Sequence, residues 1–197
     1  MRRDALLFIG IFILVILGFL LIITSGHGKK PAAPKTTAPA VLALPDYATT
    51  DATTSMTIDG TINGDELHRA IRITIGNDSR ELQIIQGYSG HVLSTQSFYD
   101  TQDAYGVFLR AINNTGFLTK LKNSTAPSDE RGQCPQGNRY IFELDQNGTT
   151  LSRLWASDCG AAVGTLGGNS SLLQSIFELQ IPGYQNLVQN VNLAASQ

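Results

Sequence analysis

The sequence predicts an α+β fold, with a single-span N-terminal transmembrane helix, a tether rich in proline and threonine, and then one domain that has an antiparallel sheet with two to three helices packed on one face. Three observations lead to this prediction. Residues 5–23 are uninterrupted apolar residues, and residues 24–54 are rich in proline and threonine. Residues 55–197 show strand-like alternation first and amphipathic helical spacing later. A strand-rich segment combined with such helices is typical of an α+β domain.

The apolar run from Ala5 to Ile23 contains no charged side chain. As a helix rising about 1.5 Å per residue, it is long enough to cross the roughly 30 Å hydrocarbon core of a bilayer. We therefore expect a retained signal anchor that forms a single-pass transmembrane helix in the lipid bilayer and leaves residues 1–4 as a short tail. The run exceeds the apolar region of most cleaved signal peptides, so cleavage after a small residue such as Gly26 is the less favoured alternative.

Two cysteines, Cys134 and Cys159, decide the expected orientation of this anchor. Basic residues flank the apolar run on both sides, so charge alone does not orient it. An even pair of cysteines in a polar domain predicts a disulfide bond, which is stable in an oxidising compartment. The amino terminus is therefore expected in the cytoplasm and the domain outside the cell membrane. Two free thiols are the alternative, and zinc is less favoured because no further ligands are evident.

Residues 24–54 predict a flexible tether between the anchor and the domain. Pro31, Pro34, Pro39 and Pro45 are spaced among alanine, serine and threonine. Proline removes backbone donors and favours extended conformations, while small polar side chains bury too little apolar area to offset the cost of ordering. The tether should hold the domain away from the bilayer surface.

Four strands are expected at the start of the domain. Residues 55–62, 70–75 and 80–87 alternate apolar and polar side chains, and residues 91–98 show a weaker form of the same pattern. Asparagine-containing turn sequences separate the first three strands. The expected result is a meander of antiparallel strands.

Helical spacing follows in three segments. The first helix starts near Asp100, which serves as a cap, and ends at Gly116 in a left-handed conformation. A second amphipathic helix has Asn169 or Ser170 as its N-cap, and a third covers residues 184–193. A short strand is also expected just after the first helix, at Phe117 to Leu121.

A β-hairpin is expected in residues 138–160, because its two arms flank Asn147-Gly148, the strongest hairpin signal in the chain. The two cysteines lie just outside its ends, where they can meet. The first arm presents one apolar face, and two residues of the second arm are expected across from it: Tyr140, Phe142 and Leu144 face Leu151 and Trp155.

The charge of the domain argues against nucleic-acid binding. From Asp46 onward there are nine basic and fifteen acidic residues, and the basic residues are not grouped. Binding of nucleic acid needs clustered lysine and arginine. The run from Asp59 to Glu66 shares residue types with a calcium loop, but Thr61 and Ala70 stand at ligand positions, so a tight connection between strands is favoured. No metal and no cofactor is expected.

No catalytic set stands out among the domain's reactive residues. His68 and His91 have no recognised ligand or triad spacing, so a structural or solvated role is favoured for both. The sequence GYSG at residues 87–90 lacks the glycine spacing of a nucleophile elbow and is interpreted as a turn. One loop before a helix could offer backbone N–H groups to an anion, although it lacks the lysine of a phosphate loop: Gly167, Gly168 and Asn169.

The leading hypothesis is a non-catalytic binding or interaction domain of the cell envelope, anchored in the membrane, with an envelope protein or a glycan as its partner. One alternative is an envelope-associated hydrolase that uses His68 or His91 with a nearby carboxylate. The other is an accessory subunit whose apolar helix packs within a membrane complex.

Overall fold

The computed structural model describes residues 42–160 and 164–194. They belong to one compact unit, Val41–Gln197. The predicted anchor and the tether up to residue 41 lie outside the described residues. Within the described part of the chain, no helix has the length and apolarity needed to cross a membrane.

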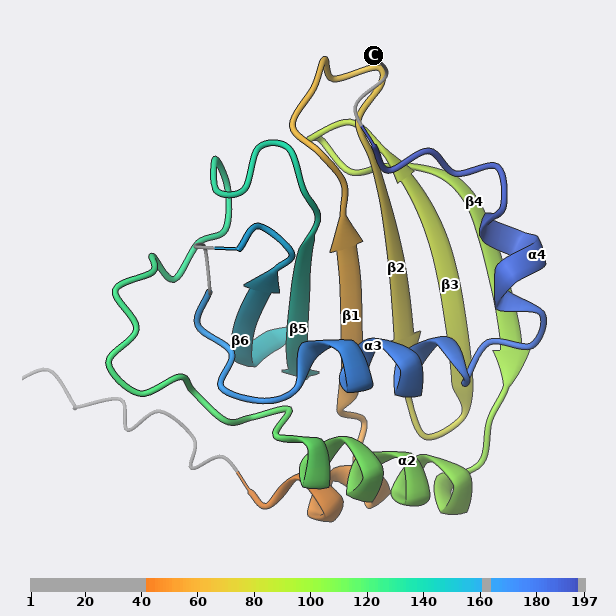
Figure 1. Cartoon of the computed structure of the whole chain (residues 1–197). Helices are drawn as coiled ribbons and strands as arrows, with labels where there is room; N and C mark the ends of the chain where they lie inside the picture. Colours follow the sequence, from red (N-terminus) through yellow and green to blue (C-terminus); the bar gives the residue numbers. More distant parts are fainter. Residues whose placement is uncertain (1–41, 161–163, 195–197) are drawn as a thin grey trace, which may run out of the picture. The chain divides into compact units, whose positions relative to one another are not determined.

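The unit is built on a six-stranded antiparallel sheet with the order β4-β3-β2-β1-β5-β6 (Figure 1). The first four strands form the predicted meander, and the hairpin β5–β6 returns to pair with β1. The strands are β1 (Thr53–Asp59), β2 (Arg69–Ile75), β3 (Ser79–Gln86), β4 (His91–Tyr99), β5 (Arg139–Gln146) and β6 (Thr149–Ser157).

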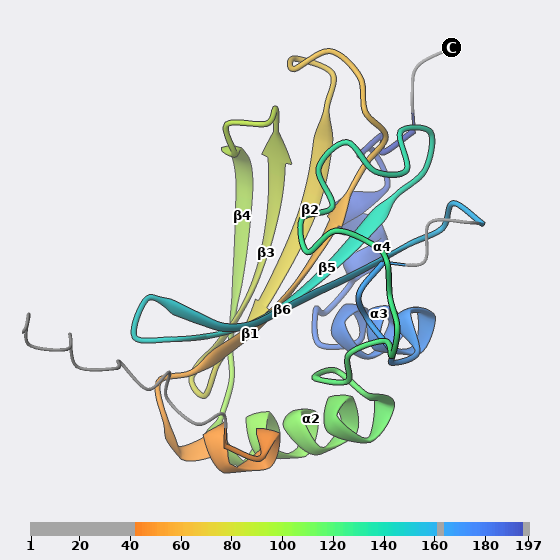
Figure 2. The same ribbon diagram turned by 90° about the vertical axis from the view of Figure 1, so that its left-hand side faces the viewer.

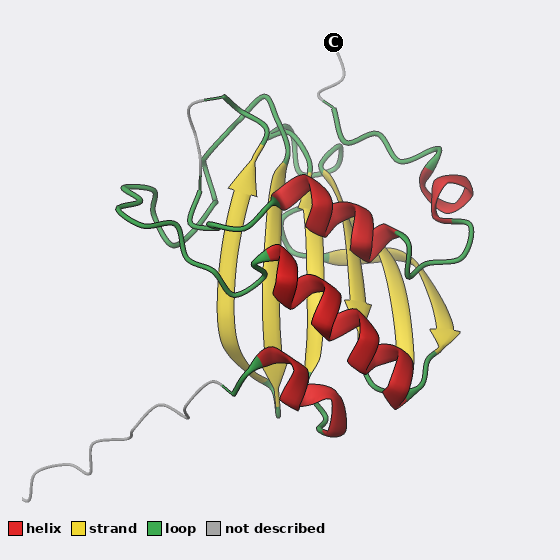
Figure 3. Cartoon of the chain, turned by 60° about the horizontal axis from the view of Figure 1, so that its bottom comes forward, coloured by secondary structure: helices red, strands yellow, loops and turns green. Residues whose placement is uncertain are grey.

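The helices lie on one face of this sheet, as Figure 3 shows in red over the yellow strands, and this confirms the predicted α+β class. Figure 2 shows the opposite face of the sheet without helices. We call this opposite face the open face. The helical elements are the 3₁₀ helix η1 (Leu44–Thr49) and the α-helices α2 (Gln102–Thr115), α3 (Ser170–Glu178) and α4 (Tyr184–Val188).

The hydrophobic core fills the space between the sheet and the helices. Alternate residues of the central strands point into it, and four phenylalanines from α2, α3, β5 and the loop after α2 contact one another there. Burying such a side chain contributes about 1.5–3 kcal/mol. These rings are Phe108, Phe117, Phe142 and Phe177.

Two predicted helix ends agree with the structure and one differs by a residue. Gly116 ends α2 with φ 89°, in the left-handed conformation. Asn169 caps α3, because its side-chain oxygen accepts a hydrogen bond from Leu172 N at 3.0 Å. The N-cap of α2 is Thr101 and not Asp100, since the Thr101 hydroxyl accepts from the amide of Ala104.

Two other expectations at the element level were wrong. The third helix ends at Val188 instead of Leu193. Residues 117–121 do not form a strand, and Lys120 makes only an isolated bridge with Leu166.

The hairpin forms around Asn147 and Gly148, which have φ values of 51° and 71°. Two adjacent positive φ values are what a two-residue hairpin turn of type I′ requires. The predicted facing of Trp155 was wrong, because Trp155 pairs with Ile141 and its ring lies on the open face. A register shift between Leu144 and Asp145 explains the error, since a bulge inverts the alternation that a regular hairpin would have.

The folded domain starts before residue 55, where the sequence placed its boundary. Within the segment expected to be tether, η1 buries Leu44 and Tyr47 to 1% exposure each. The helix η1 packs against α2. Both side chains belong to the hydrophobic core, so the end of the predicted tether is part of the folded domain.

Candidate functional site

The open face of the sheet carries a cleft of about 350 Å³. Alternate residues of each strand point to this face, and residues paired across neighbouring strands lie side by side on it. Thr57 of β1 lies opposite Arg72 of β2, which lies opposite Gln83 of β3. Apolar side chains fill the floor between them: Ala70, Ile85, Val92 and Ile141.

A row of alternating charges crosses the cleft. Arg72 donates from Nε to Thr57 Oγ1 at 3.0 Å, and its Nη2 lies 3.8 Å from Glu143 Oε2. Arg153 donates from Nε to Glu143 Oε1 at 3.0 Å and from Nη2 to Glu130 Oε1 at 2.7 Å. The hydrogen bond to Glu130 is the main reason that the pKa of Arg153 is raised above its usual value. The row is thus held in place by its own ion pairs.

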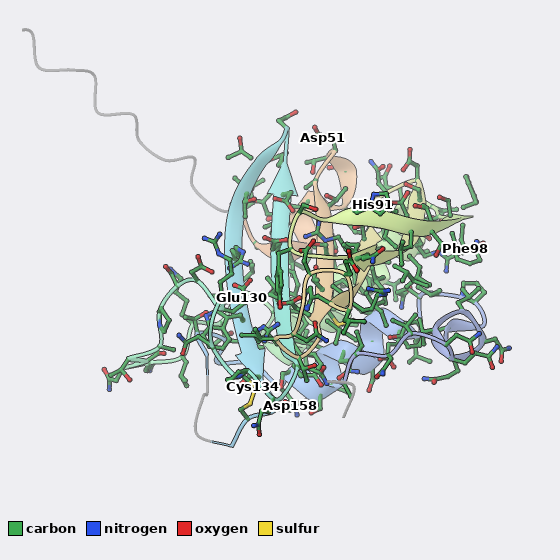
Figure 4. The ribbon with its side chains drawn as sticks, turned by 90° about the horizontal axis from the view of Figure 1, so that it is seen from above. Asp51, His91, Phe98, Glu130, Cys134 and Asp158 are labelled. Carbon is green, nitrogen blue, oxygen red and sulfur yellow. A yellow bond between two sulfur atoms is a disulfide. The ribbon has the colours of Figure 1, made fainter. Side chains whose placement is uncertain are left out.

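The loop between α2 and β5 closes one side of the cleft. It brings Glu130 and Arg131 to the cleft wall, and Figure 4 shows Glu130 near the β5–β6 hairpin. The Trp155 indole N–H donates to Pro127 O at 2.8 Å and ties this loop to β6. A buried tryptophan whose N–H finds such a partner is a stable anchor for a loop.

A buried ionic cluster lies at the end of the cleft. Arg139, which is 1% exposed, donates from Nε and Nη2 to Asp59 Oδ2 at 2.9 and 2.6 Å. The other oxygen, Asp59 Oδ1, lies 2.7 Å from Nε2 of the buried His68. Arg139 also donates to the backbone carbonyls of Gly60, Gln133 and Cys134. The guanidinium therefore joins β1, β5 and the loop before β5.

The ring of His68 is fully engaged within the protein. Its Nδ1 lies 3.1 Å from the carbonyl oxygen of Thr61, while Nε2 faces Asp59. Both ring nitrogens thus face oxygen acceptors, and the residue is 3% exposed. A general base needs a nitrogen within reach of its substrate. The geometry does not offer one here.

Tyr88 lies against this cluster and is exposed at the rim of the cleft. Its ring stacks on His68 with centroids 4.1 Å apart and an interplanar angle of 17°. The hydroxyl donates to Asn63 O at 2.9 Å and accepts from Asn63 N at 3.1 Å. The backbone N–H of Tyr88 donates to Asp65 Oδ1 at 2.7 Å. The position of the ring is thereby fixed at three points.

The structure separates the two histidines that the sequence singled out. His68 lines the cleft, whereas His91 is exposed at the first residue of β4 and is not among the residues that line it (Figure 4). The GYSG segment forms the predicted turn, with Gly87 at φ 70° and Gly90 at φ 77°.

The loop before α3 uses its backbone N–H groups internally. Gly167 N donates to Thr119 O at 2.7 Å, and Asn169 N donates to Thr115 O at 3.1 Å. A Cβ added to Gly168 would lie 2.5 Å from the carbonyl oxygen of Gly116. The glycines therefore allow α3 to approach the end of α2, and these two N–H groups are not open to an anion.

The predicted disulfide between Cys134 and Cys159 is present, with Cα atoms 5.5 Å apart (Figure 4). Asp158 lies beside it, and its Oδ1 accepts from Asn138 N at 2.8 Å. Cys134, Asp158 and Cys159 lie close enough together to hold a metal ion, but the two sulfur atoms are already bonded to each other. The calcium-like segment is also engaged, because Asp59 and Asp65 bind protein groups.

Most residues that line the cleft were not singled out by the sequence. Arg72, Glu143 and Arg153 stand at the polar positions of strands whose apolar positions were used to predict the core. The same alternation could have marked them as one face. Which strands are neighbours, and therefore which charges meet, is a long-range property that alternation does not give.

No protein-family model matches the chain, and no curated protein matches its sequence significantly.

Proposed function

We propose that the chain is a membrane-anchored, non-catalytic binding domain of the cell envelope, and that the cleft on the open face holds its ligand. The observation that carries this proposal is the cleft itself, with polar side chains already fixed by ion pairs and one aromatic ring exposed at its rim. Ligand sites are typically concave, largely preformed and supplied with a few polar groups that set orientation.

The anchor and its orientation belong to the same proposal. Residues 5–23 would hold the chain in the bilayer, with the domain on the extracytoplasmic side. The disulfide supports this placement, because such bonds persist in oxidising compartments. The net negative domain would then face an envelope protein or a glycan.

A hydrolase is the second candidate function, because His68 and Asp59 lie 2.7 Å apart at the cleft. Arg139 occupies the other Asp59 oxygen, and both nitrogens of His68 are engaged, so the His68–Asp59 contact resembles a structural hydrogen bond more than a general base with its carboxylate. Replacing His68 by alanine in a chain with detected hydrolytic activity tests this candidate. Loss of activity with an unchanged fold would favour it over a binding domain.

Retention of envelope material tests the binding proposal directly. The full-length chain in detergent is immobilised and exposed to solubilised envelope extract, as wild type and as the double variant Arg72→Ala/Glu143→Ala. The double variant removes one positive and one negative charge, so the net charge does not change. Arg110→Ala, an exposed residue on α2, serves as the control.

We expect the wild type and Arg110→Ala to retain the same component. The double variant should retain at least about tenfold less of that component. Equal retention by all three chains, or none by the wild type, would contradict the proposed role of the cleft.

A further inference from the structure

We infer that the ligand of the cleft is a glycan, one sugar ring of which packs on the exposed face of Tyr88. This inference rests on the proposed binding function and names its ligand class. It starts from an unusual combination in the structure: an aromatic ring that is strongly fixed by the protein and yet 55% exposed.

The exposed surface of Tyr88 can be assigned from its contacts. One ring face is covered by His68, and the hydroxyl is bonded to the backbone of Asn63. The surface left for a ligand therefore includes the other ring face. A fixed aromatic face costs little conformational entropy when a ligand packs on it, because the ring is already ordered.

The cluster behind Tyr88 explains why the ring is fixed. His68 cannot shift without losing its contacts with Asp59 and Thr61 O, and Asp59 is held by the buried Arg139. Arg139, Asp59 and His68 thus form a row of contacts that ends under the tyrosine ring. In this arrangement they are positioning residues for a ligand surface.

The groups beside Tyr88 complement a sugar. A sugar ring has a face of C–H groups and a rim of hydroxyls, each of which both donates and accepts hydrogen bonds. The cleft offers an aromatic face together with planar groups of both kinds, since Arg72 donates, Glu143 accepts and Gln83 does both. Its volume of about 350 Å³ falls in the range of small-ligand sites.

The charges of the cleft disfavour other ligand classes. Among the described residues that line it, three carboxylates balance three arginines: Asp59, Glu130 and Glu143 against Arg72, Arg131 and Arg153. Arg153 would have to give up its ion pairs with Glu130 and Glu143 to bind a phosphate or carboxylate ligand. A quaternary ammonium ligand is typically held by several aromatic rings, and the same set of described residues contains one tyrosine and no phenylalanine or tryptophan.

Binding of neutral oligosaccharides to the full-length chain in nanodiscs tests this inference. The probes are soluble hexose and N-acetylhexosamine oligomers, measured by saturation-transfer NMR and by titration calorimetry. Tyr88→Ala removes the ring, and Tyr88→Phe keeps it while removing the bonds to Asn63. Tyr99→Ala is the matched control, because Tyr99 is 78% exposed on β4 and does not line the cleft.

We expect at least one oligomer to bind the wild type and Tyr99→Ala equally, and Tyr88→Ala to bind it at least about tenfold more weakly. Tyr88→Phe should keep most of the affinity, which distinguishes loss of the ring from misfolding. Sugar binding that is unchanged in Tyr88→Ala would overturn the inference.

The failure of the sugar inference can be told apart from failure of the binding function. If no oligomer binds while envelope material is still retained through Arg72 and Glu143, the ligand class is wrong and the binding function stands. If neither the oligomers nor the envelope material binds the wild type, both proposals are overturned.

Discussion

At the scale of single residues, Arg139 shows how this domain tolerates a buried charge. Its guanidinium donates hydrogen bonds to one carboxylate and to three backbone carbonyls, so the buried charge is both paired and hydrogen-bonded. A buried charge is costly unless it is paired and fully hydrogen-bonded. The cost of removing it should appear at Asp59, which would lose its main partner.

Arg139→Met is therefore expected to destabilise the domain by about 3–5 kcal/mol, the scale for breaking a buried pair. Urea denaturation of the soluble domain checks this value, with Arg131→Met as a control in which an 84% exposed side chain is changed. The control should lose less than about 1 kcal/mol. Similar losses in both variants would show that the Asp59–Arg139 pair does not contribute the proposed free energy to stability.

Tyr105 makes the stability of the folded domain depend on pH. It is buried, and its hydroxyl donates to Ala52 O at 2.9 Å. Burial raises its pKa well above the usual value, and the charge of Asp100 also acts in that direction. The unfolded chain therefore releases this proton at a lower pH than the folded chain does, so stability is full below about pH 10 and falls as the pH rises above it.

We expect the free energy of unfolding to fall between about pH 8 and about pH 11, and Tyr105→Phe to reduce that fall. At about pH 8 the variant should be less stable by about 1 kcal/mol, since it loses a hydrogen bond. Urea midpoints at the two pH values measure both effects. An unchanged pH dependence in Tyr105→Phe would assign the fall to other groups, such as Tyr184, whose pKa burial also raises.

At the scale of elements, the end of α2 and the start of α3 depend on glycines. Gly116 has φ 89°, and a Cβ there would lie 2.9 Å from the Cα of Gly168. The side chain of any other residue would thus meet both backbone strain and a backbone contact. The two helices can approach only because both positions lack a Cβ.

Gly116→Ala is expected to cost more than the about 1–2 kcal/mol of left-handed strain alone. Gly148→Ala is the matched control, because Gly148 has φ 71° and an added Cβ would meet no atom within 4 Å. Thermal or urea unfolding of both variants gives the difference. Equal losses would show that the contact between the two helix ends adds nothing.

The elements also show how far the sequence alone could lead. The alternation of β1 to β3, the Asn147-Gly148 turn and the Asn169 cap are local signals, and the structure confirms them. The facing of Trp155 was wrong because the register shifts between Leu144 and Asp145, and the alternation of apolar and polar residues does not reveal such a bulge. The sequence indicates Tyr88 only as part of a turn. Its stacking on His68 is a long-range contact, which a local sequence pattern does not reveal.

At the scale of the whole molecule, the sheet divides the domain into a packed side and an open side (Figure 2). The helices and the core give stability, while ion pairs hold the charged side chains of the open face in fixed places. The disulfide is linked to the cleft as well, because the backbone carbonyl of Cys134 accepts a hydrogen bond from Arg139 at the end of the cleft.

Removal of the disulfide is expected to lower the free energy of unfolding by about 3 kcal/mol, as chain entropy predicts for a closed loop of this length. Urea denaturation of Cys134→Ser/Cys159→Ser against the wild type measures it. Intact mass before and after alkylation is the accompanying check. Free thiols in the native chain would contradict the bond and reopen the orientation of the anchor.

We propose that the open face, and not the helical face, receives the ligand. Hydrogen–deuterium exchange of the full-length chain, with and without solubilised envelope extract, tests it most directly. We predict protection in β2, β3 and the loop carrying Glu130, with no change in α2. Protection confined to α2 and α3, or absent from the whole domain, would contradict the claim.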